Sequence, residues 1–570
     1  MTARRRYTLS LVIAVAAACM LAGVANAQNA DMVVLNGKVF TADAGSSLQE
    51  GFAIRDGRFI AVGTSAAMRG HIGAATRVID LQGLFVTPGL SDGHLHGVSG
   101  GPGIDLSTTR SLEELFAVVG RAAKDAKPGD VIVSNSDWHE AQLQEKRLPT
   151  ARELDQFAPV NPVVLVRGGH EFVLNSAAFA KWNVTKNTPS PAGGEIPREP
   201  DGELNGELVD NARALVTLPP ARAPTMDNVL AQQRTLNSYG ITSVRIPGGF
   251  RLGEFFTVLD LVLEARKRDL LSVRYNVYLP AARAGTRVVD TQSMRQILAR
   301  SPLKQDEGDE WVRLGGVKLG VDGGFEGGFM TKPFVGEMGR GGTYFGINTV
   351  PAAPFTAITK MLAQGGWRVT AHAVGDAAID LVLDGYEAAN TERSIVGRRW
   401  AIEHLFVSRP DHMARMKKLD LTLSVQDHLY LAGPSLKKYL GPERATQITP
   451  VKTYLDQGFL VVGGTDSPVV PVNPFWVFYH FLTRDTMQDG VYGENERVTS
   501  RVDLLRMITI NYAKLTGEAD IKGSIEPGKL ADFAVLSEDL LAAPEGNIQQ
   551  MKALATFVGG REVYRDPSYQ

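Results

Sequence analysis

Near both ends of the chain, short apolar runs alternate with turn residues. Residues 32–35 lead into a turn at Asn36-Gly37, and residues 52–54 and 58–63 flank a turn at Asp56-Gly57. Runs of the same character return at 531–536 and 555–564. Short strands joined by such turns are typical of β-hairpins. The pattern therefore predicts one small β-sandwich composed of residues 28–83 and 525–570.

Between the two ends, apolar strand candidates alternate with amphipathic helical stretches. This alternation is typical of βα units that build a parallel sheet. Eight parallel strands close naturally into a barrel. The pattern therefore predicts an α/β fold, a (β/α)8 TIM-type barrel over residues 84–524, with an inserted subdomain at 98–238 after the first barrel strand. The strand candidates are residues 84–90, 241–244, 273–278, 313–319, 368–372, 400–404, 422–425 and 459–463.

The first 27 residues follow a different pattern. Arg4-Arg5-Arg6 precede an apolar run over residues 9–24, and Ala25-Asn26-Ala27 supplies small residues at a cleavage position. This layout is typical of a secretory signal peptide. We expect cleavage after Ala27 and export to the periplasm or the medium, with no stable membrane anchor afterwards. Because Cys19 is the one cysteine and lies in this segment, the mature chain would hold neither disulfides nor thiolate ligands.

Composition narrows the range of partners. The 570 residues are 44% hydrophobic and 21% charged, which is ordinary for a soluble globular protein. The formal net charge is −2, and no basic block interrupts the sequence. These features argue against a nucleic-acid partner and leave a small-molecule substrate as the expectation. Homo-oligomer formation is left open.

The segment Asp92-Gly93-His94-Leu95-His96 directly follows the first predicted barrel strand. Side chains of an extended chain alternate in direction, so His94 and His96 project to one face. Imidazole is the commonest protein ligand for zinc-like ions, so this strand end can offer two nitrogens to one metal. Alone, the pattern fits a pair of hydrogen-bonded histidines equally well.

Further ionisable residues end other predicted strands. His372, His404 and Asp466 each close a strand, and the carboxyl ends of barrel strands meet at one face. Lys318 lies in an apolar, glycine-rich strand, where an unpaired amine is costly to bury unless its tip reaches solvent. Each residue alone has an ordinary structural interpretation. Together they predict a shared cation at the carboxyl face.

At this point the chain resembles the amidohydrolase superfamily, and within it the amidohydrolase 3 branch, which includes N-substituted formamide deformylase-like proteins. The resemblance extends from about Asp31 to Tyr564. It rests on motifs spread along the chain: Val86-Thr87-Pro88-Gly89-Leu90, Asp92 to His96, Asp137-Trp138-His139-Glu140, Arg167-Gly168-Gly169-His170, Val317-Lys318, Asp322-Gly323, His372-Ala373-Val374-Gly375-Asp376, Ile402-Glu403-His404, Gly464-Thr465-Asp466-Ser467-Pro468 and Gly528-Lys529-Leu530-Ala531-Asp532.

The resemblance implies a divalent-metal centre, most often zinc, with one or two ions. It assigns His94, His96, His372 and His404 as ligands, and Lys318 as the lysine that can form a metal-bridging carbamate with carbon dioxide. It assigns Asp466 as a metal contact that shuttles a proton. A metal lowers the pKa of bound water to roughly 7, and the carboxylate would accept its proton and pass it to a leaving nitrogen. The implied reaction is hydrolysis of a non-peptide, amide-type C–N bond in a small molecule.

Two segments depart from the usual family pattern. Residues 324–330 follow Asp322 where a serine- and leucine-bearing loop is common, and Asp427 stands before His428 where a proline is common. The expected pocket lining is therefore specific to this chain, and it comprises Trp138, His170, Asp322, Gln426 and His428.

Other functions remain open from sequence. An ester or lactone hydrolase, or an isomerase, could use the same scaffold. An exported non-catalytic binding protein is a further alternative, although a binder has no need of Asp466 as a proton shuttle. For Trp138 and His170, a purely structural role is as compatible with the sequence as a place in the pocket.

Overall fold

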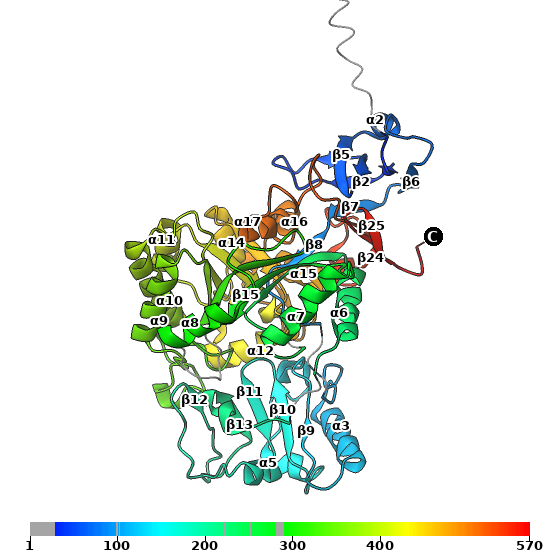
Figure 1. The fold of residues 1–570 in the computed structure, drawn as a ribbon. Coiled ribbons are helices and arrows are strands. Elements are labelled where there is room, and N and C mark those ends of the chain that lie inside the picture. Colours follow the sequence, from blue (N-terminus) through cyan, green and yellow to red (C-terminus); the bar gives the residue numbers. More distant parts are fainter. Residues whose placement is uncertain are drawn as a thin grey trace, which may run out of the picture.

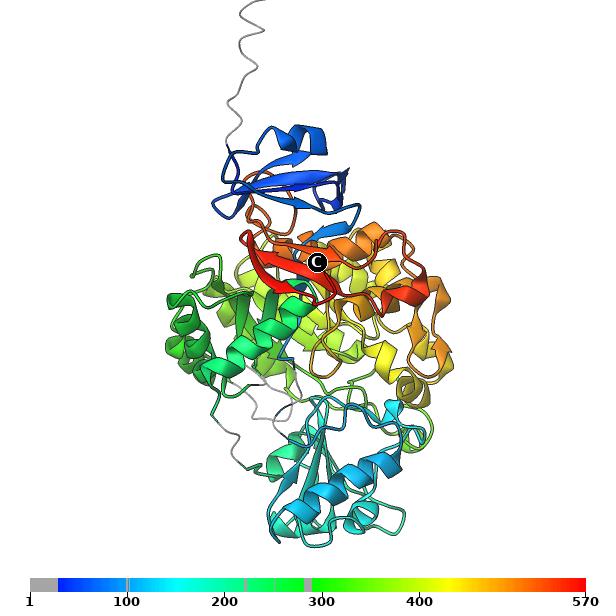
Figure 2. The same ribbon diagram turned by 90° about the vertical axis from the view of Figure 1, so that its right-hand side faces the viewer.

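The computed structural model describes residues 29–98, 101, 103–219, 223–250, 252–280 and 290–569. The predicted signal segment lies outside these ranges. A β-sandwich, a central barrel and an inserted subdomain follow one another along the long axis of the molecule (Figures 1 and 2). Within the described ranges, no helix is both long enough and apolar enough to cross a membrane.

An eight-stranded, all-parallel sheet forms the barrel, as the alternating pattern predicted. Neighbouring strands follow chain order, and the N–H of Gly93 donates to the carbonyl of Gly463 (3.0 Å), which joins the first strand region to the last. The strands are β8 (Leu90–Asp92), β14 (Ile241–Pro247), β15 (Arg274–Pro280), β16 (Val312–Gly320), β17 (Val369–Ala373), β18 (Ala401–His404), β19 (Thr422–Gln426) and β20 (Val461–Gly464).

Amphipathic helices cover the outside of the barrel (Figure 1). In α9, for example, Phe355, Ile358 and Leu362 are buried on one side at helical spacing, and they join the barrel core. The covering helices are α6 (Met226–Ser238), α7 (Phe255–Lys267), α8 (Thr291–Arg300), α9 (Ala352–Gln364), α10 (Asp376–Glu392), α11 (Pro410–Lys418), α14 (Val451–Asp456), α15 (Pro474–Thr483), α16 (Arg501–Met507) and α17 (Ile510–Thr516). The helix α12 (His428–Leu440) lies between the barrel and the inserted subdomain, where its Leu429 and Leu436 share a core with Val209, and the short α13 (Pro442–Ala445) follows it.

The β-sandwich combines both chain ends, as predicted. Phe52 and Phe533 pack edge to face at 4.9 Å, and Phe533 stacks on Phe557 at 4.3 Å, so residues from both ends share one core. One sheet has the order β5-β4-β1-β6 and the other β25-β24-β23-β7-β2-β3. Their strands are β1 (Met32–Leu35), β2 (Lys38–Phe40), β3 (Leu48–Gln49), β4 (Gly51–Arg55), β5 (Arg58–Gly63), β6 (Arg77–Asp80), β7 (Phe85–Pro88), β23 (Phe533–Leu536), β24 (Ala553–Val558) and β25 (Arg561–Arg565).

The run 84–90, predicted as the first barrel strand, is instead divided between two sheets. β7 pairs with β2 and β23 in the sandwich, and only β8 enters the barrel. Gly89 lies between them, where a Cβ would come within 2.1 Å of the Thr242 hydroxyl oxygen. The absence of a side chain thus lets the chain pass closely from one sheet into the other.

The inserted subdomain is built on a five-stranded sheet of order β12-β13-β11-β10-β9. It is shorter than the predicted 98–238, because α6 belongs to the barrel: Val229 and Leu236 of α6 are buried in the barrel core. The subdomain comprises α3 (Leu112–Asp125), β9 (Ile132–Val133), η1 (Glu140–Gln142), α4 (Ala151–Asp155), β10 (Val163–Arg167), β11 (Glu171–Leu174), α5 (Ser176–Lys181), β12 (Gly194–Glu195), β13 (Glu207–Asp210) and η2 (Asn211–Leu215).

Candidate functional site

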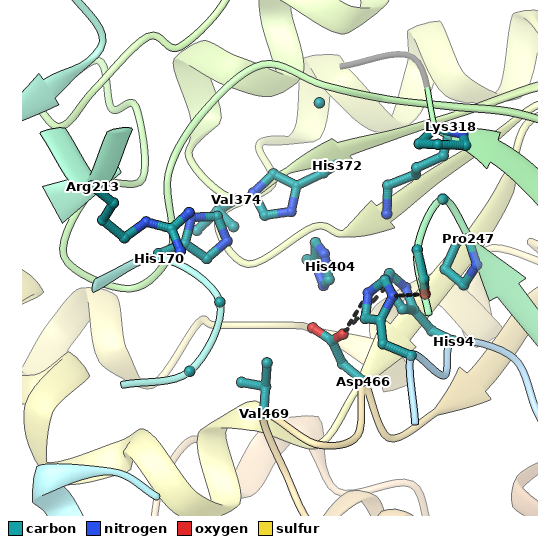
Figure 3. Close-up of a pocket in the computed structure, with 18 of the residues that line it drawn as sticks. His94, His170, Arg213, Pro247, Lys318, His372, Val374, His404, Asp466 and Val469 are labelled. Atoms are coloured by element: carbon teal, nitrogen blue, oxygen red, sulfur yellow. Dashed lines mark hydrogen bonds and ion pairs between the residues drawn. The ribbon is translucent and has the colours of Figure 1, made fainter. Parts of the chain in front are cut away.

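A cavity of about 810 Å³ lies between the carboxyl ends of the barrel strands and the inserted subdomain. The side chains of Lys318, His372, His404, His94 and Asp466 point toward a common centre in it (Figure 3). Reactive groups gather at this face in barrel enzymes because every parallel strand ends there. The cavity is therefore the candidate site, and the sequence-predicted residues meet in it.

Hydrogen bonds orient the two histidines after β8. The Nδ1 of His94 lies 2.8 Å from a carboxylate oxygen of Glu403, and the Nδ1 of His96 lies 2.8 Å from the carbonyl of Gly249. Because both partners are acceptors, both Nδ1 atoms donate and both Nε2 atoms keep a lone pair. These Nε2 atoms lie 3.4 and 3.2 Å from the same oxygen of Asp466.

A second group of donors forms around the other oxygen of Asp466. The Nε2 of His428 lies 3.1 Å from that oxygen. The Nδ1 of His404 lies 2.7 Å from the side-chain carbonyl of Gln426, which again leaves Nε2 with its lone pair. One ligand atom each from His94, His96 and Asp466, and likewise from His404, His428 and Asp466, lie within 4.8 Å of one another.

His372 and Lys318 complete the ring of strand ends. The His372 Nε2 donates to the carbonyl of Gly323 (3.1 Å), so its lone pair is on Nδ1. Its ring centroid lies 4.5 Å from that of His404. Lys318 on β16 is buried and lines the same cavity.

Burial sets the protonation of these groups. It lowers the pKa of His94 to about 3 and that of His404 well below its usual value, so both rings are neutral near pH 7. Burial also lowers the pKa of Lys318 to about 8, although Glu403 and Asp466 oppose the shift. Burial alone would raise the pKa of Asp466, but the surrounding histidines, among them His428, whose Nε2 donates to the carboxylate, outweigh it and hold the pKa well below its usual value.

Glu403 supports the centre and was considered in the sequence only as the neighbour of His404. It is fully buried and accepts hydrogen bonds from His94, from Arg245 at 2.6 Å and from Thr370. Burial would raise the pKa of Glu403, but Arg245 and His94 outweigh it and hold it well below its usual range. The sequence signal that could have identified Glu403 is a carboxylate inside an apolar strand. Burying such a carboxylate costs free energy unless a cation or hydrogen-bond donor pairs with it.

The donor set fits a divalent transition metal. It consists of imidazole nitrogens with available lone pairs and an ionised carboxylate, the ligands that zinc prefers when thiolates are absent. The outer group of Asp380, Asp411 and His412 differs, since Arg409 lies 2.9 Å from Asp380 and from Asp411 and already supplies a positive charge.

Of the five residues that the sequence predicted to line the pocket, four do so and one does not. Trp138, His170, Asp322 and His428 line the cavity. Asp322 also accepts the backbone N–H of Gly375 (2.8 Å), which fixes the turn that follows β17. The prediction for Gln426 is wrong: it is not among the described residues that line the cavity, because it is buried behind His404 and holds that ring.

A second buried ionic cluster borders the cavity on the side of the inserted subdomain, and sequence reasoning missed it. Arg167 on β10 forms a two-pronged contact with Glu140 at 2.7 and 2.8 Å. The Nη1 of Arg167 lies 2.6 Å from Glu326, in the segment after β16, and 3.5 Å from Glu171. Burial raises the pKa of Glu171 well above its usual value, which favours its neutral form. We call Arg167, Glu140, Glu171 and Glu326 the Arg167 cluster.

A (β/α)8 barrel with imidazole and carboxylate donors converging at its carboxyl face defines the class of metal-dependent barrel hydrolases. The model of the Amidohydrolase family matches residues 77–564. The chain belongs to this family and is a hydrolase of the amidohydrolase superfamily.

Relatives and solved structures agree with this assignment. The protein LONG AFTER FAR-RED 3 of Arabidopsis thaliana is 32% identical, over 94% of this chain and 92% of its own length. The N-substituted formamide deformylase of Arthrobacter pascens is 28% identical, over 94% and 98%. An uncharacterized metal-dependent hydrolase from Pyrococcus horikoshii shares the fold with a TM-score of 0.66 at 24% identity, covering 90% of this chain and 99% of its own.

Proposed function

We propose that this protein is a metal-dependent amidohydrolase that cleaves a non-peptide, amide-type C–N bond in a small molecule. The observation that carries the proposal is the convergence of His94, His96 and His404 on an ionised Asp466. The similarity to an N-substituted formamide deformylase supports the choice of bond. Zinc is the proposed metal, as one or two ions, with His94, His96, His372, His404, Lys318 and Asp466 as the ligands.

When bound, such a metal lowers the pKa of its water to roughly 7 and polarises the substrate carbonyl. Asp466 would act as the general base, because its carboxyl lines the cavity and is ionised at neutral pH. The same carboxyl returns the proton to the leaving nitrogen. His428, 3.1 Å from Asp466, orients that carboxylate.

Lys318 is proposed to contribute as a carbamate. Its amine has a pKa of about 8 because of burial, so a useful fraction is uncharged near neutrality. The ammonium first loses one proton, and the uncharged amine then adds to carbon dioxide and releases a second proton, so that the buried cation becomes a carbamate anion. That conversion would explain why a lysine is placed in an apolar strand of the barrel.

The rest of the lining sets the substrate class. Phe172, Phe250, Phe256 and Phe406 are among the cavity-lining residues, and apolar walls of this kind favour a substrate with a hydrophobic substituent. A small molecule carrying one amide beside such a group would place its carbonyl among the strand ends and its substituent against these rings.

The test is hydrolysis of a panel of N-substituted formamides and N-acyl amines, with matched esters, before and after chelation. We expect amide turnover that chelator abolishes and zinc restores. Asp466→Asn should lower kcat by about 10²–10⁴-fold, whereas Asp411→Asn on α11 should leave it unchanged. Turnover that survives complete metal removal, or a fully loaded enzyme that cleaves only the esters, would overturn the proposal.

A further inference from the structure

His170 and Asp210 form a hydrogen-bonded pair at the edge of the cavity, contributed by the inserted subdomain. His170 lies between β10 and β11, and its Nδ1 is 2.7 Å from an oxygen of Asp210, the last residue of β13. Asp210 is fully buried, while the His170 side chain is about one-fifth exposed and lines the cavity. Figure 3 shows His170 on the side of the cavity away from Lys318 and His94.

The pair fixes which nitrogen of His170 can meet a ligand. A carboxylate oxygen can only accept, so Nδ1 donates and Nε2 carries the lone pair. Nε2 is therefore a hydrogen-bond acceptor in the same cavity as the candidate metal ligands. An acceptor beside His372 that Asp210 holds in place suits a substrate group that has an N–H to donate.

The barrel is shaped to receive this pair. A Cβ on Gly323 would lie 2.1 Å from an oxygen of Asp210, and a Cβ on Gly324 would lie 3.0 Å from the His170 ring. The segment after β16 thus packs backbone directly against both side chains. The His170 ring is also held 5.3 Å, centroid to centroid, from the ring of His372.

The backbone at Asp210 adds a second sign of constraint. Its φ of 47° and ψ of −118° are unfavourable for a residue with a side chain. Such a conformation persists only where the surroundings impose it, and these positions concentrate at ligand-binding sites. Here the surroundings are Gly323, Gly327 and His170, all in contact with the Asp210 carboxyl.

We propose that His170 is a substrate-binding residue that accepts a hydrogen bond from the substrate's amide N–H, so that the enzyme selects amides with one N-substituent over N,N-disubstituted ones. This inference rests on the proposed amide hydrolysis. A site that hydrogen-bonds a donor rejects analogues lacking it, because its own polar atom is then left unpaired. Asp210 acts as the positioning residue that keeps the proton on Nδ1.

The experiment compares N-phenethylformamide with its N-methyl homologue as substrates of the zinc-loaded full chain. The ratio of their kcat/KM values is the readout, since a merely structural role would lower both values together. Burial raises the pKa of Asp210 to about 7, so assays at alkaline pH keep that carboxyl ionised. We expect the wild type to prefer N-phenethylformamide and His170→Phe to reduce this preference about tenfold.

Three further variants sharpen the result. His170→Gln should retain part of the preference, because its side-chain carbonyl can accept the N–H. Asp210→Asn should also lose it, because an amide can donate to Nδ1 and move the proton to Nε2, and this variant carries the test if His170→Phe does not fold. His412→Phe removes a similar buried His–Asp contact, 3.1 Å from Asp380, outside the cavity and should leave the ratio unchanged.

The outcomes separate the two proposals. An unchanged ratio in folded, zinc-loaded His170→Phe and Asp210→Asn would overturn the role of His170 and leave amide hydrolysis standing. Failure of the zinc-loaded wild type to cleave either formamide or any other amide of the panel would overturn both.

Discussion

Two buried groups of ionisable residues border one cavity: the Arg167 cluster and the residues around Asp466. The buried negative charge is compensated differently in the two groups. In the Arg167 cluster, one guanidinium contacts Glu140 and Glu326 at 2.6–2.8 Å, so the positive charge comes from the chain itself. At the strand ends, Asp466 is surrounded by histidines, of which His94 and His404 are neutral near pH 7. There Asp466 contacts histidines rather than a guanidinium, and Lys318, the amine that points toward the same centre, has a pKa that burial lowers to about 8.

The contrast indicates the purpose of each group. A charge cluster that is neutralised internally joins elements that are distant in sequence, here the inserted subdomain and the segment after β16. A cluster whose donors all point inward is matched to a cation supplied from outside. Arg245 serves the second group in a different way, because it neutralises Glu403 behind the histidines rather than occupying their centre.

Among substitutions that test this contrast, the largest expected effect is a loss of stability on removal of the Arg167 guanidinium. Arg167→Met leaves buried carboxylates without their cation and should lower the free energy of unfolding by about 3–5 kcal/mol. Arg147→Met removes an exposed pair with Glu153 and should cost less than about 1 kcal/mol. Denaturant titration measures both. Equal losses in the two variants would show that the Arg167 cluster does not hold the subdomain to the barrel.

Metal affinity should distinguish the two groups more finely. Glu403→Gln weakens the acceptor that orients His94 and should reduce zinc affinity about 10–100-fold with the fold retained. Glu140→Gln, in the Arg167 cluster, should alter stability and leave zinc affinity unchanged. Competition with a chelating dye gives both values. A similar loss of affinity in each variant would contradict the division of roles.

The smallest effect expected, when taken per pH unit, is a pH dependence of stability. Burial lowers the pKa of His139, which contacts Glu140, to about 3 from an ordinary 6.5. Below pH 6.5 the unfolded chain binds a proton that the folded chain excludes, so this residue makes stability fall as pH falls toward 3. Relative to the wild type, metal-free His139→Gln should lose less stability with acidification, by up to about 1.4 kcal/mol per pH unit. If the free energy of unfolding changed with pH in the same way in the wild type and in His139→Gln, the pH dependence would not come from His139.

Much of the fold was accessible from sequence because apolar periodicity follows local geometry. The barrel and the composite sandwich followed from the alternation of strands and helices. The division of residues 84–90 at Gly89 did not, because only the close approach of Thr242 explains it. The place of α6 likewise depends on which core buries Val229 and Leu236.

The site could likewise be predicted from the sequence only in part. His94, His96, His372, His404 and Asp466 were recognisable because each follows or ends a strand, and strand ends share one face of a barrel. Partners on other strands carry no such signal. Arg245 and Glu403 are 158 positions apart in the chain, and Arg167 and Glu326 are 159 apart. Their pairing follows from the closed barrel and the docked subdomain rather than from any local pattern.

The most direct test of the central claim is X-ray diffraction from zinc-loaded crystals at energies on both sides of the metal absorption edge. The account predicts an anomalous peak between the Nε2 atoms of His94 and His96 and the carboxylate of Asp466, with density on Lys318 for a carbamate. A fully folded protein that shows no peak there under excess zinc, or a peak only at Asp380, Asp411 and His412, would contradict it.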